Sequence, residues 1–381
     1  MRHGGDIYRN KVNIDFSVNL SPLPLPDAAS DMIGSAMLTG LREAKYYPDP
    51  EQYEVRTSLT GSDNVDYGCI YAGSGASELI MACIRAVNPV NILMPLPCYT
   101  GYIHAVNALN SMPDRSTNQA INTQNTAYKI SDAASFAGNP QIIRYFLKKE
   151  NDYRLTGDIL TCLTDEIDLL FLTDPWNPCG ANIEDDLLMA ILNKAHDHRI
   201  SVILDQSFLF MSDKITYPSS VSAKELIAQY DNLFIIRSYT KLFALPGIRM
   251  GYIISAKSNI TELKKQLPEW NLSSVAARTM TACSDIVRNT SYINYNISLI
   301  IKERDYLTEE LKKSGFRVFH SDTAFILFES GYNLYTGLLN HGILIRDCSD
   351  YEGLGKGFYR IAVKDHRSNV LLIDSIRSLF Q

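Results

Sequence analysis

Short apolar runs alternate with longer amphipathic segments from residue 69 to about residue 240, and this alternation restricts the possible folds most. The run "CIYAG" precedes the helical pattern "ASELIMACIRAV", and "ISVILDQSF" follows the amphipathic "DDLLMAILNKAHDHR". Strands that are connected through helices form parallel sheets with helices on their faces. We therefore predict an α/β fold with a mostly parallel sheet. The predicted strands are residues 69–73, 91–95, 167–175, 200–208 and 232–240, and the predicted helices are residues 76–87, 98–106 and 185–199.

The C-terminal third has a different character. Long helical patterns over about 259–313 give way to the apolar runs "FRVFH", "AFILFE", "ILIRDC" and "FYRIAVK", and a last helix is expected over 371–380. This order predicts a smaller α+β domain. A chain of 381 residues can form one large and one small domain. We predict an N-terminal segment over 1–45 that joins the small domain, a large domain over 46–255 and the small domain over 256–381.

Two stretches depart from this pattern. "SPLPLP", residues 21–26, must be extended, because each Pro lacks an N–H donor and restricts the residue before it. It belongs either to the small domain or to a crossing between the domains. Residues 108–140 are rich in Asn, Ser, Thr and Ala and lack periodicity, which indicates a surface insertion. A lid over a site is the alternative.

Composition argues against several kinds of partner. The chain has 36 Lys and Arg against 42 Asp and Glu, and no stretch concentrates basic residues as in a nucleic-acid binder. No run reaches the roughly 18 apolar residues of a membrane span, and the N-terminus lacks a signal peptide's apolar core. Seven scattered cysteines without a Cys-x-x-Cys pair are typical of a reducing compartment. We expect a cytoplasmic protein without nucleic-acid, membrane or metal partners.

Lys241 lies between two apolar runs in "IIRSYTKLFALPGIRMGYIIS". Burial of an ammonium group removes its hydration, which lowers the pKa of the lysine and makes the neutral amine available for chemistry. The alternative is a lysine at the rim of a strand, with its charged end in water. The neighbouring residues must decide between the two, and Ser238, Thr240 and Arg249 lie in the same stretch.

Further polar residues follow the predicted strands at their carboxyl ends, where open α/β sheets bind ligands. The first strand runs into the glycine-rich turn "AGSGASELI", whose N–H groups and helix dipole suit a phosphate, although such a turn often only begins a helix. Asn177 stands in the turn "DPWNPCG", and Asp205 ends the run "SVILD". A carboxylate in that place needs a cationic or N–H partner, and a helix cap or loop anchor is the alternative role.

Taken together, these residues match the requirements of pyridoxal 5′-phosphate (PLP). This cofactor needs a lysine for its Schiff base, an anion that keeps the pyridine nitrogen protonated, a donor to the ring oxygen and a clamp for the phosphate. Lys241, Asp205 and Asn177 meet the first three needs, and the glycine-rich turn with the nearby hydroxyls and arginine meets the last. The large domain would then be the cofactor-binding domain.

The same motifs resemble the fold-type-I aminotransferase superfamily over nearly the whole chain, the insertion excepted. The likeness rests on "YYPDP", "GSGASELI", "PLPCYTGY", "DPWNPCG", "VILDQSF", "RSYTKLFALPGIRMGY" and "FYRIAVK", in this order. It implies the PLP-dependent transferase fold of type I and a homodimer with shared active sites. It implies catalytic roles for Lys241, Asp205, Asn177 and Tyr99, of which Tyr99 stacks on the ring. The implied phosphate-binding residues are Gly75, Ala76, Ser77, Ser238, Thr240 and Arg249, with Tyr47 reaching the phosphate in the neighbouring subunit.

Within the superfamily, the chain is most similar to the histidinol-phosphate aminotransferase branch. Inside that branch it resembles the threonine-phosphate decarboxylases, which make aminopropanol phosphate for cobalamin. The segments "HGGD", "IDFSVNLSPL" and "ILIRDCSDYEGLGKGFYRIAVK" are the basis of this likeness. It makes His3, Arg346 and Arg360 candidates for binding the substrate's phosphate or carboxylate. For His3, a mobile terminal histidine is the alternative.

The chain also departs from the superfamily's pattern next to Asp205. Phe208 stands where the superfamily usually has a tyrosine that donates to the ring oxygen, and phenylalanine cannot donate. The decarboxylase-like members often have phenylalanine there too, which favours a decarboxylase. Gln206 and Ser207 replace the frequent Glu-Ala, and "WNPCG" replaces "NNPTG".

Three functions are compatible with these residues. We predict the first, decarboxylation of an amino acid with a second anionic group, such as L-threonine O-3-phosphate or O-phosphoserine, to the phosphorylated amino alcohol. The second is an aminotransferase of the histidinol-phosphate type, or one with another acidic or aromatic substrate. The third is a catalytically silent protein that keeps the fold. Orientation decides between the first two, because the bond that stands perpendicular to the cofactor ring is the one that breaks.

Overall fold

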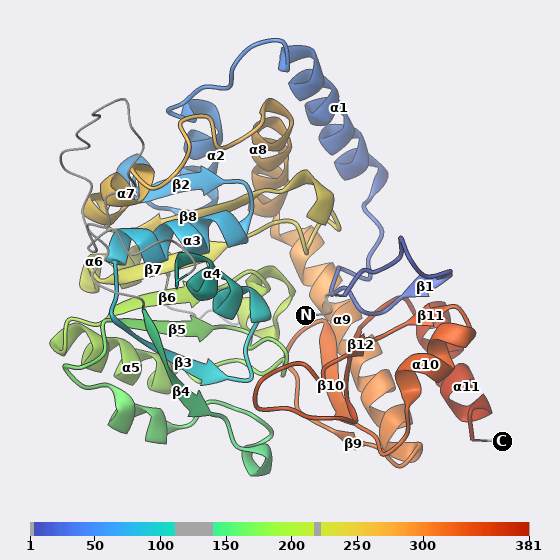
Figure 1. Cartoon of the computed structure of the whole chain (residues 1–381). Coiled ribbons are helices and arrows are strands. Elements are labelled where there is room, and N and C mark those ends of the chain that lie inside the picture. Colours follow the sequence, from blue (N-terminus) through green and yellow to red (C-terminus); the bar gives the residue numbers. More distant parts are fainter. Residues whose placement is uncertain (1–3, 111–139, 217–221, 381) are drawn as a thin grey trace, which may run out of the picture.

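The structure, a computed structural model, describes residues 4–110, 140–216 and 222–380. Two sheets organise this part of the chain, one with seven strands and one with four. They lie side by side in Figure 1, the larger built from the middle of the chain and the smaller from its C-terminal part. A third, two-stranded parallel sheet pairs residues near the beginning of the described chain with residues of its C-terminal part.

The seven-stranded sheet has the order β2-β8-β7-β6-β5-β3-β4. Strand β8 is antiparallel to both of its neighbours, and the strands from β7 to β4 pair in parallel. The central strands are buried on both faces, which is why they read as continuous apolar runs. The predicted α/β class with a mostly parallel sheet is confirmed. The strands are β2 (Ile70–Gly73), β3 (Asn91–Leu96), β4 (Gln141–Phe146), β5 (Leu169–Thr173), β6 (Ser201–Asp205), β7 (Leu233–Arg237) and β8 (Gly251–Ser255).

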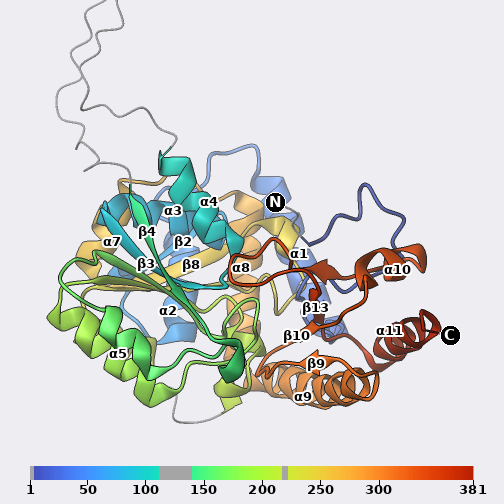
Figure 2. The ribbon, with the colours of Figure 1, turned by 60° about the horizontal axis from the view of Figure 1, so that its bottom comes forward.

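Helices cover both faces of this sheet, and each face has its own apolar core (Figure 2). The first core packs the strands against α3 (Ala76–Val87), α4 (Thr100–Asn110) and α7 (Lys257–Lys264). The second packs them against α2 (Tyr53–Asp63), α5 (Asp185–Asp197), α6 (Ala223–Gln229) and α8 (Ser274–Arg288). Successive side chains of a strand point to opposite faces of its sheet. The side chains of Asp205, the last residue of β6, and of Gln206, the residue after it, accordingly line different cavities.

The four-stranded sheet is antiparallel and has the order β12-β13-β10-β9. Its strands pack in a third apolar core with helices from the C-terminal part of the chain. Helix α9 contributes Ile293 and Ile297 to the large sheet's core and Leu307 and Leu311 to this one, so a single long helix joins the two. The elements are β9 (Arg317–Val318), β10 (Phe325–Glu329), β12 (Arg346–Asp347), β13 (Phe358–Ala362), α9 (Thr290–Lys313), α10 (Leu334–Asn340) and α11 (His366–Ser378).

The N-terminal segment touches both parts of the molecule. Strand β1 (Ile14–Asp15) pairs in parallel with β11 (Ile343–Leu344), and α1 (Asp27–Glu43) packs on α8. The proline-rich stretch between them has neither helix nor strand, as each proline requires. Within it, the Ser21 N–H donates to the Lys241 carbonyl oxygen at 3.0 Å. The segment thus contacts the turn that contains Lys241.

The predicted domain limits at 45/46 and 255/256 stay a prediction. Helix α7, which follows residue 255, packs on α3 and on β2 of the large sheet, so the chain leaves that sheet's layers later than the predicted limit. Of the insertion predicted over 108–140, residues 108–110 end α4, and residues 111–139 lie outside the described residues.

Short 3-10 helices are η1 (Tyr67–Cys69), η2 (Lys149–Asn151), η3 (Gly157–Cys162), η4 (Leu209–Met211), η5 (Asp213–Thr216) and η6 (Pro246–Ile248).

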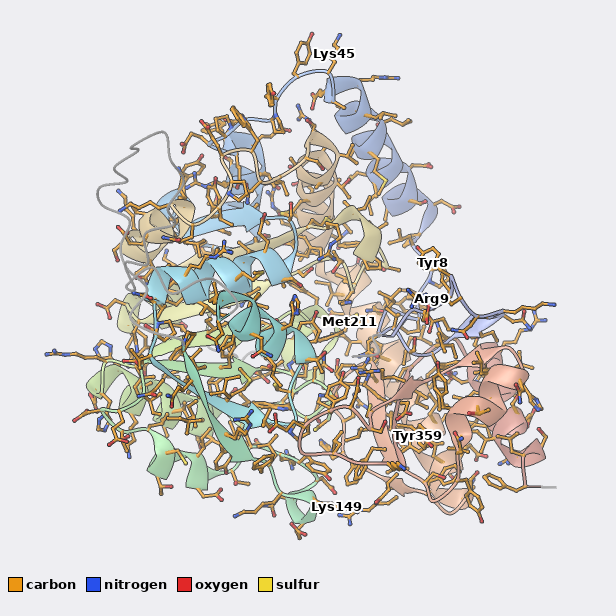
Figure 3. The ribbon with its side chains drawn as sticks, in the orientation of Figure 1. Tyr8, Arg9, Lys45, Lys149, Met211 and Tyr359 are labelled. Carbon is orange, nitrogen blue, oxygen red and sulfur yellow. The ribbon has the colours of Figure 1, made fainter. Side chains whose placement is uncertain are left out.

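Ion pairs connect the layers of the two sheets. Lys149 Nζ lies 2.7 Å from Glu329 Oε2 at the end of β10, and Figure 3 places Lys149 where the two parts of the ribbon meet. Arg144 on β4 pairs with Glu352 at 2.5 Å. The first contact joins β10 to the segment after β4, and the second joins the loop that contains Glu352 to β4 at the edge of the large sheet. Among the described residues, no helix is long and apolar enough to cross a membrane.

Candidate active site

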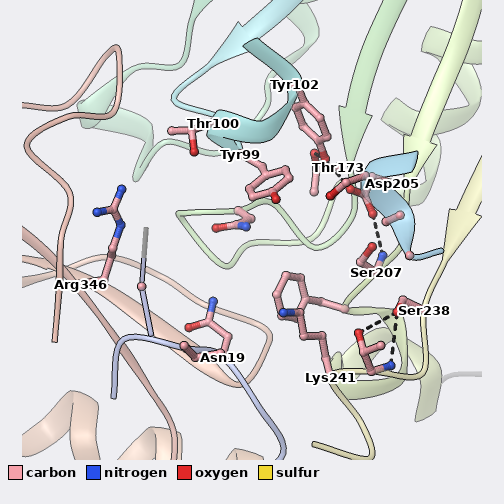
Figure 4. A pocket seen from close by; sticks show the side chains of 18 of the residues that line it. Asn19, Tyr99, Thr100, Tyr102, Thr173, Asp205, Ser207, Ser238, Lys241 and Arg346 are labelled. Carbon is pink, nitrogen blue, oxygen red and sulfur yellow. Dashed lines mark hydrogen bonds between the residues drawn. The ribbon is translucent and has the colours of Figure 1, made fainter. Parts of the chain in front are cut away.

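Most of the residues that the sequence singled out line one cavity of about 300 Å³ (Figure 4). It lies at the carboxyl ends of β2, β5, β6 and β7, and β12 and β13 of the small sheet close its other side. Open α/β sheets bind ligands at this edge. The predicted site residues in its lining are Gly75, Ala76, Ser77, Tyr99, Asn177, Asp205, Ser238, Thr240, Lys241, Arg249, Arg346 and Arg360.

Lys241 projects into this cavity from the turn between β7 and β8. The pKa of its amine is lowered from 10.5 to about 8. Burial is the largest cause, the charges of Arg360 and Arg249 also lower the pKa, and the charge of Asp205 opposes them. Its Nζ lies 5.8 Å from the centre of the Phe208 ring, in the direction of the ring face. The partly buried side chain, its place in the cavity lining and its lowered pKa favour a chemical role over that of a lysine with its charged end in open water.

Asp205, the last residue of β6, is held by two donors. Tyr102 Oη donates to Asp205 Oδ2 at 2.6 Å, and the Ser207 N–H donates to Asp205 Oδ1 at 2.9 Å. Thr173 Oγ1 lies 2.9 Å from Tyr102 Oη. Burial, and then the charge of Asp205, raise the pKa of Tyr102 well above its ordinary value, so the phenol keeps its proton and donates. The carboxylate therefore has a fixed orientation at the cavity wall.

Sequence reasoning missed Tyr102, although a signal for it existed. Tyr102 lies three residues after Tyr99, and residues at this spacing on a helix share a face. Their rings meet edge to face, with centres 5.4 Å apart, and Tyr102 also stacks on Phe171 at 4.9 Å. Both tyrosines line the cavity: Tyr99 directly precedes α4, and Tyr102, in its first turn, also holds the aspartate.

The glycine-rich turn forms an anion seat at the N-terminus of α3. Gly75 has φ +87°, a conformation that favours glycine, and α3 has no side-chain cap there. A Cβ at Gly75 would lie 2.8 Å from Arg249 Nη2, so only glycine lets the guanidinium approach the turn this closely. Ser238 Oγ and Thr240 Oγ1 lie 2.8 Å apart in the same lining. Uncapped N–H groups, hydroxyls and an arginine together suit a phosphate.

Asn177 connects this part of the cavity with the arginines. Its Oδ1 accepts a hydrogen bond from Arg360 Nη1 at 2.6 Å, which leaves its amide N–H groups as donors. The preceding Trp176 is buried and donates from Nε1 to the Pro97 carbonyl oxygen at 2.7 Å. That bond fixes the loop that leads to Tyr99. Trp176, another residue that the sequence did not single out, therefore holds two walls of the cavity together.

Arg346 and Arg360 are paired directly across β12 and β13, and both are buried. Arg346 Nη2 donates to Asp350 Oδ1 at 2.7 Å. Arg360 donates to the Ser17 carbonyl oxygen at 3.1 Å and to Asn177, and its Nε has no hydrogen-bond partner. Buried guanidinium groups require anionic partners, and Asp350 balances Arg346 whereas the acceptors of Arg360 are neutral oxygens. This side of the cavity therefore has positive charge that suits a ligand with negative charge.

Three buried polar atoms without a hydrogen-bond partner belong to residues of this cavity. They are Asn19 Oδ1, Ser207 Oγ and Arg360 Nε. An unpaired buried donor or acceptor costs free energy, so groups of this kind indicate capacity for a polar ligand. Asn19 and Ser207 were not predicted as site residues, although both stand in quoted motifs. With the lysine, the carboxylate and the anion seat, the donor set fits PLP.

Two predicted residues are not in this lining. Tyr47 is 79% exposed, and its ring packs at a tilt against Trp270 with centres 4.7 Å apart, away from the cavity of its own chain. His3 lies outside the described residues. Its immediate neighbour Gly4 lines the cavity, beside Ser17 and Asn19. The role of Tyr47 toward a neighbouring subunit stays a prediction.

Comparison with known proteins agrees with this geometry. The model of the family "Aminotransferase class I and II" matches residues 14–376. A relative from Caldanaerobacter subterraneus named "Putative threonine-phosphate decarboxylase" is 29% identical over 100% of this chain and 94% of its own. A histidinol-phosphate aminotransferase from Thermoanaerobacter pseudethanolicus is 27% identical over 98% of this chain and 93% of its own.

Solved structures share this fold. The histidinol-phosphate aminotransferase from Clostridium acetobutylicum superimposes with a TM-score of 0.79, at 27% identity, over 96% of this chain and 98% of its own. The histidinol-phosphate aminotransferase from Sinorhizobium meliloti, solved in complex with pyridoxal 5′-phosphate, has a TM-score of 0.76 at 19% identity, over 97% of this chain and 92% of its own.

Proposed function

Because the chain belongs to the class I and II aminotransferase family, with the type I fold and PLP as its cofactor, we propose that it decarboxylates an amino acid with a second anionic group. The substrate of this proposal is L-threonine O-3-phosphate or O-phosphoserine, and the products are CO2 and the phosphorylated amino alcohol. The buried pair Arg346 and Arg360 is the observation that supports it.

The two arginines suit a substrate with two negative groups. Arginine binds carboxylate and phosphate through paired N–H donors, and such charge-assisted bonds are among the strongest polar contacts in proteins. Arg360 reaches Asn177 and has a free Nε, and Arg346 stands beside it on the next strand. Asn19, with its unpaired Oδ1, lies in the same lining and can accept from an amine or hydroxyl. We assign the carboxylate and phosphate of the substrate to this group of residues, with His3 as a further candidate.

The residues at the other end of the cavity are proposed to hold the cofactor. Lys241 would attach the cofactor, Asp205 and Asn177 would bind the polar atoms of its ring, and Tyr99 would contact the ring. When bound, PLP supplies an electron sink for the bond that breaks at the substrate's α-carbon. The proposed phosphate-binding residues are Gly75, Ala76, Ser77, Ser238, Thr240 and Arg249.

The protein's own groups orient the substrate and move the proton. Loss of CO2 leaves a carbon that must gain a proton, and Lys241 is the acid in the cavity whose pKa, about 8, suits that transfer near neutral pH. Tyr102 and the Ser207 N–H hold the Asp205 carboxylate in a fixed orientation. The arginines hold the carboxylate, and the direction in which they hold it determines which bond breaks.

An aminotransferase of the histidinol-phosphate type is the second candidate. Its support is the likeness to histidinol-phosphate aminotransferases in both sequence and structure. The same arginines would bind its substrate's phosphate. Lys241 would remove the α-proton, whereas in the decarboxylation it donates a proton to the carbon that has lost CO2. The two reactions therefore use the same residues and differ in substrate orientation.

We also propose a homodimer with shared sites, in the cytoplasm. Exposed apolar side chains gather around α1, α2 and the segment before α8, among them Leu41, Tyr46, Tyr47, Tyr53 and Trp270. A second cavity of about 470 Å³ opens among residues of this surface. Apolar surface of this kind supports association with another chain. In the proposed dimer Tyr47 reaches the phosphate of the partner's cofactor.

The decisive experiment uses PLP-loaded protein and O-phosphothreonine or O-phosphoserine, without an oxo-acid acceptor. We expect repeated turnover to phosphorylated aminopropanol or ethanolamine, detected by mass spectrometry. Conversion of one equivalent of bound PLP to its pyridoxamine form, without any amine product, would instead support the aminotransferase. The Lys241→Ala variant serves as the control, because product formed at the same rate by this variant would come from free PLP or a contaminant.

A further inference from the structure

Ser207 presents a hydroxyl that the protein itself leaves unpaired. It lies in the turn after β6, and its N–H donates to Asp205 Oδ1 at 2.9 Å. Its Oγ is buried and has no hydrogen-bond partner, and the residue lines the cavity. Figure 4 draws Ser207 next to Asp205 among the side chains around that space.

An unpaired serine hydroxyl is unusual because it rotates freely and commonly bonds to a nearby backbone group. A buried hydroxyl without a partner loses its hydrogen bonds to water and gains none in the protein, which destabilises the fold. Asn19 and Arg360, the other residues of this cavity with unpaired atoms, belong to the side near the small sheet. Ser207 lies two residues after Asp205 and is hydrogen-bonded to it, and therefore belongs to the cofactor's side.

Other hydroxyls on that side have already given their protons to protein acceptors. Tyr102 donates to Asp205. Ser238 Oγ donates to the Met250 carbonyl oxygen at 3.0 Å, so the 2.8 Å contact between Ser238 and Thr240 uses the proton of Thr240. Phe208 has no donor in its side chain. The proton of Ser207 is not committed to any of these contacts.

We propose that Ser207 is a cofactor-binding residue whose hydroxyl donates a hydrogen bond to an anionic oxygen of bound PLP. The ring oxygen and the phosphate oxygens share the chemistry that this donor recognises. Alanine in this place, which the Glu-Ala pattern of related sequences provides, could not make the bond. The inference depends on the cofactor and is independent of which reaction the enzyme catalyses.

The test measures PLP binding and apoprotein stability in the Ser207→Ala variant. Because the new bond has a charged acceptor, we expect the dissociation constant for PLP to rise about tenfold. Removal of an unpaired buried hydroxyl should leave the melting temperature of the apoprotein unchanged or raise it by about 1 °C. A purely structural role would lower that melting temperature and leave PLP affinity unchanged.

Ser284→Ala is the matched control. Ser284 is also buried, and its hydroxyl donates to the Ser58 carbonyl oxygen at 3.1 Å, between α8 and α2. Its loss should lower the melting temperature of the apoprotein and leave PLP affinity unchanged. The two serines should therefore respond in opposite ways to the same chemical change.

Binding of 3-deoxypyridoxal 5′-phosphate, which lacks the ring oxygen, and of inorganic phosphate identifies the acceptor. Weaker binding of PLP alone assigns the bond to the ring oxygen, and weaker binding of all three assigns it to the phosphate. Unchanged PLP affinity in Ser207→Ala would overturn the inference. No substrate is present in these titrations, so a wrong reaction assignment would not affect their result.

Discussion

At one end of the cavity, around Asp205, Ser238 and Thr240, the side chains are hydrogen-bonded to one another and to the backbone. At the other end, Arg346 and Arg360 stand side by side, Arg346 bonded to Asp350 and Arg360 with its Nε left unpaired. The first end, which we call the cofactor end, is already organised for one constant group. The second, the substrate end, holds two guanidinium groups, of which Asp350 balances Arg346, so an arriving anion can balance the charge of Arg360. The contrast suggests that the class of chemistry and the choice of substrate are encoded by different strands.

Removal of Lys241 should have the largest effect, because it removes both the attachment of the cofactor and the proton carrier. We expect Lys241→Ala to lose the visible absorbance band of lysine-bound PLP and to turn over at least about 10³-fold more slowly. Absorbance spectra and single-turnover assays check this. Lys312→Ala, an exposed lysine on α9, is the control and should behave as wild type. Normal turnover in Lys241→Ala would refute the assignment of the cofactor end.

Asp205→Ala should have the next largest effect. The carboxylate is proposed to keep the ring cationic, so its loss should lower kcat about 10²-fold and weaken PLP binding. Tyr102→Phe removes one of the two donors to Asp205 and should cause a smaller loss of the same kind, of about threefold. Stopped-flow turnover and PLP titration of both variants test this order. Equal effects of the two substitutions would contradict a positioning role for Tyr102.

Changes at the substrate end should affect substrate affinity and leave the cofactor in place. We expect Arg346→Met to raise KM for O-phosphothreonine about 50-fold, because a charge-assisted bond in a buried place is lost. The visible band of bound PLP should be unchanged in this variant. Arg346→Lys should recover only part of the affinity, since lysine lacks the planar pair of donors. A KM that stays at the wild-type value would show that Arg346 does not bind this substrate.

The contrast between the two ends also explains what the sequence could predict. The cofactor end follows strand–turn order: Asp205 ends β6, and Lys241 follows β7, so the parallel sheet brings them to one edge. Contacts such as that of Tyr102 with Asp205 depend on how α4 lies on the sheet, and no local pattern specifies this. Asn19 reaches the cavity from an extended segment without periodicity.

The fold shows the same limit. The buried strands β5 and β7 were predicted because both faces are apolar. Strand β4 was not, because it lies at the edge of the sheet and most of its residues are partly or fully exposed, which removes the continuous apolar run. The position of α7 on the large sheet is likewise a tertiary contact that composition does not reveal.

The pH dependence of cofactor capture tests how the two ends are coupled. Burial, and then Arg360 and Arg249, lower the pKa of Lys241 from 10.5 to about 8. The rate at which apoprotein captures PLP should therefore rise with pH and level off above about 8, as the neutral amine becomes dominant. Arg360→Met removes the second cause and should move the midpoint to higher pH. A rate that keeps rising toward pH 10 in the wild type would contradict the shift.

The same shift has a consequence for stability, with a definite sign. The pKa of Lys241 is lower in the folded than in the unfolded protein. Below about pH 8 the amine is protonated in both states, and its burial as a cation makes the apoprotein less stable there. Between 8 and 10.5 the unfolded chain binds more protons, so stability rises with pH. Lys241→Met apoprotein should lack this rise, which denaturant titrations at several pH values can measure.

The smallest effect is expected for Tyr47→Phe, and it concerns whether the cofactor end is complete within one chain. Tyr47 is exposed and packs against Trp270, outside the cavity of its own chain. If its hydroxyl reaches the phosphate of the partner's cofactor, its loss should weaken PLP retention about threefold. Tyr8→Phe, also fully exposed, is the control and should change nothing.

The measurement is PLP dissociation at protein concentrations above and below the dimer's dissociation constant, with the assembly state followed by light scattering. The effect of Tyr47→Phe should be present in the dimer and absent in the monomer. Equal PLP affinity of the variant and the wild type in the dimer would refute the shared site. If the effect is found, the cofactor end is completed by a second chain, while Arg346 and Arg360 form the substrate end within one. Dilution to the monomer should then weaken cofactor binding and leave the substrate-binding arginines in place.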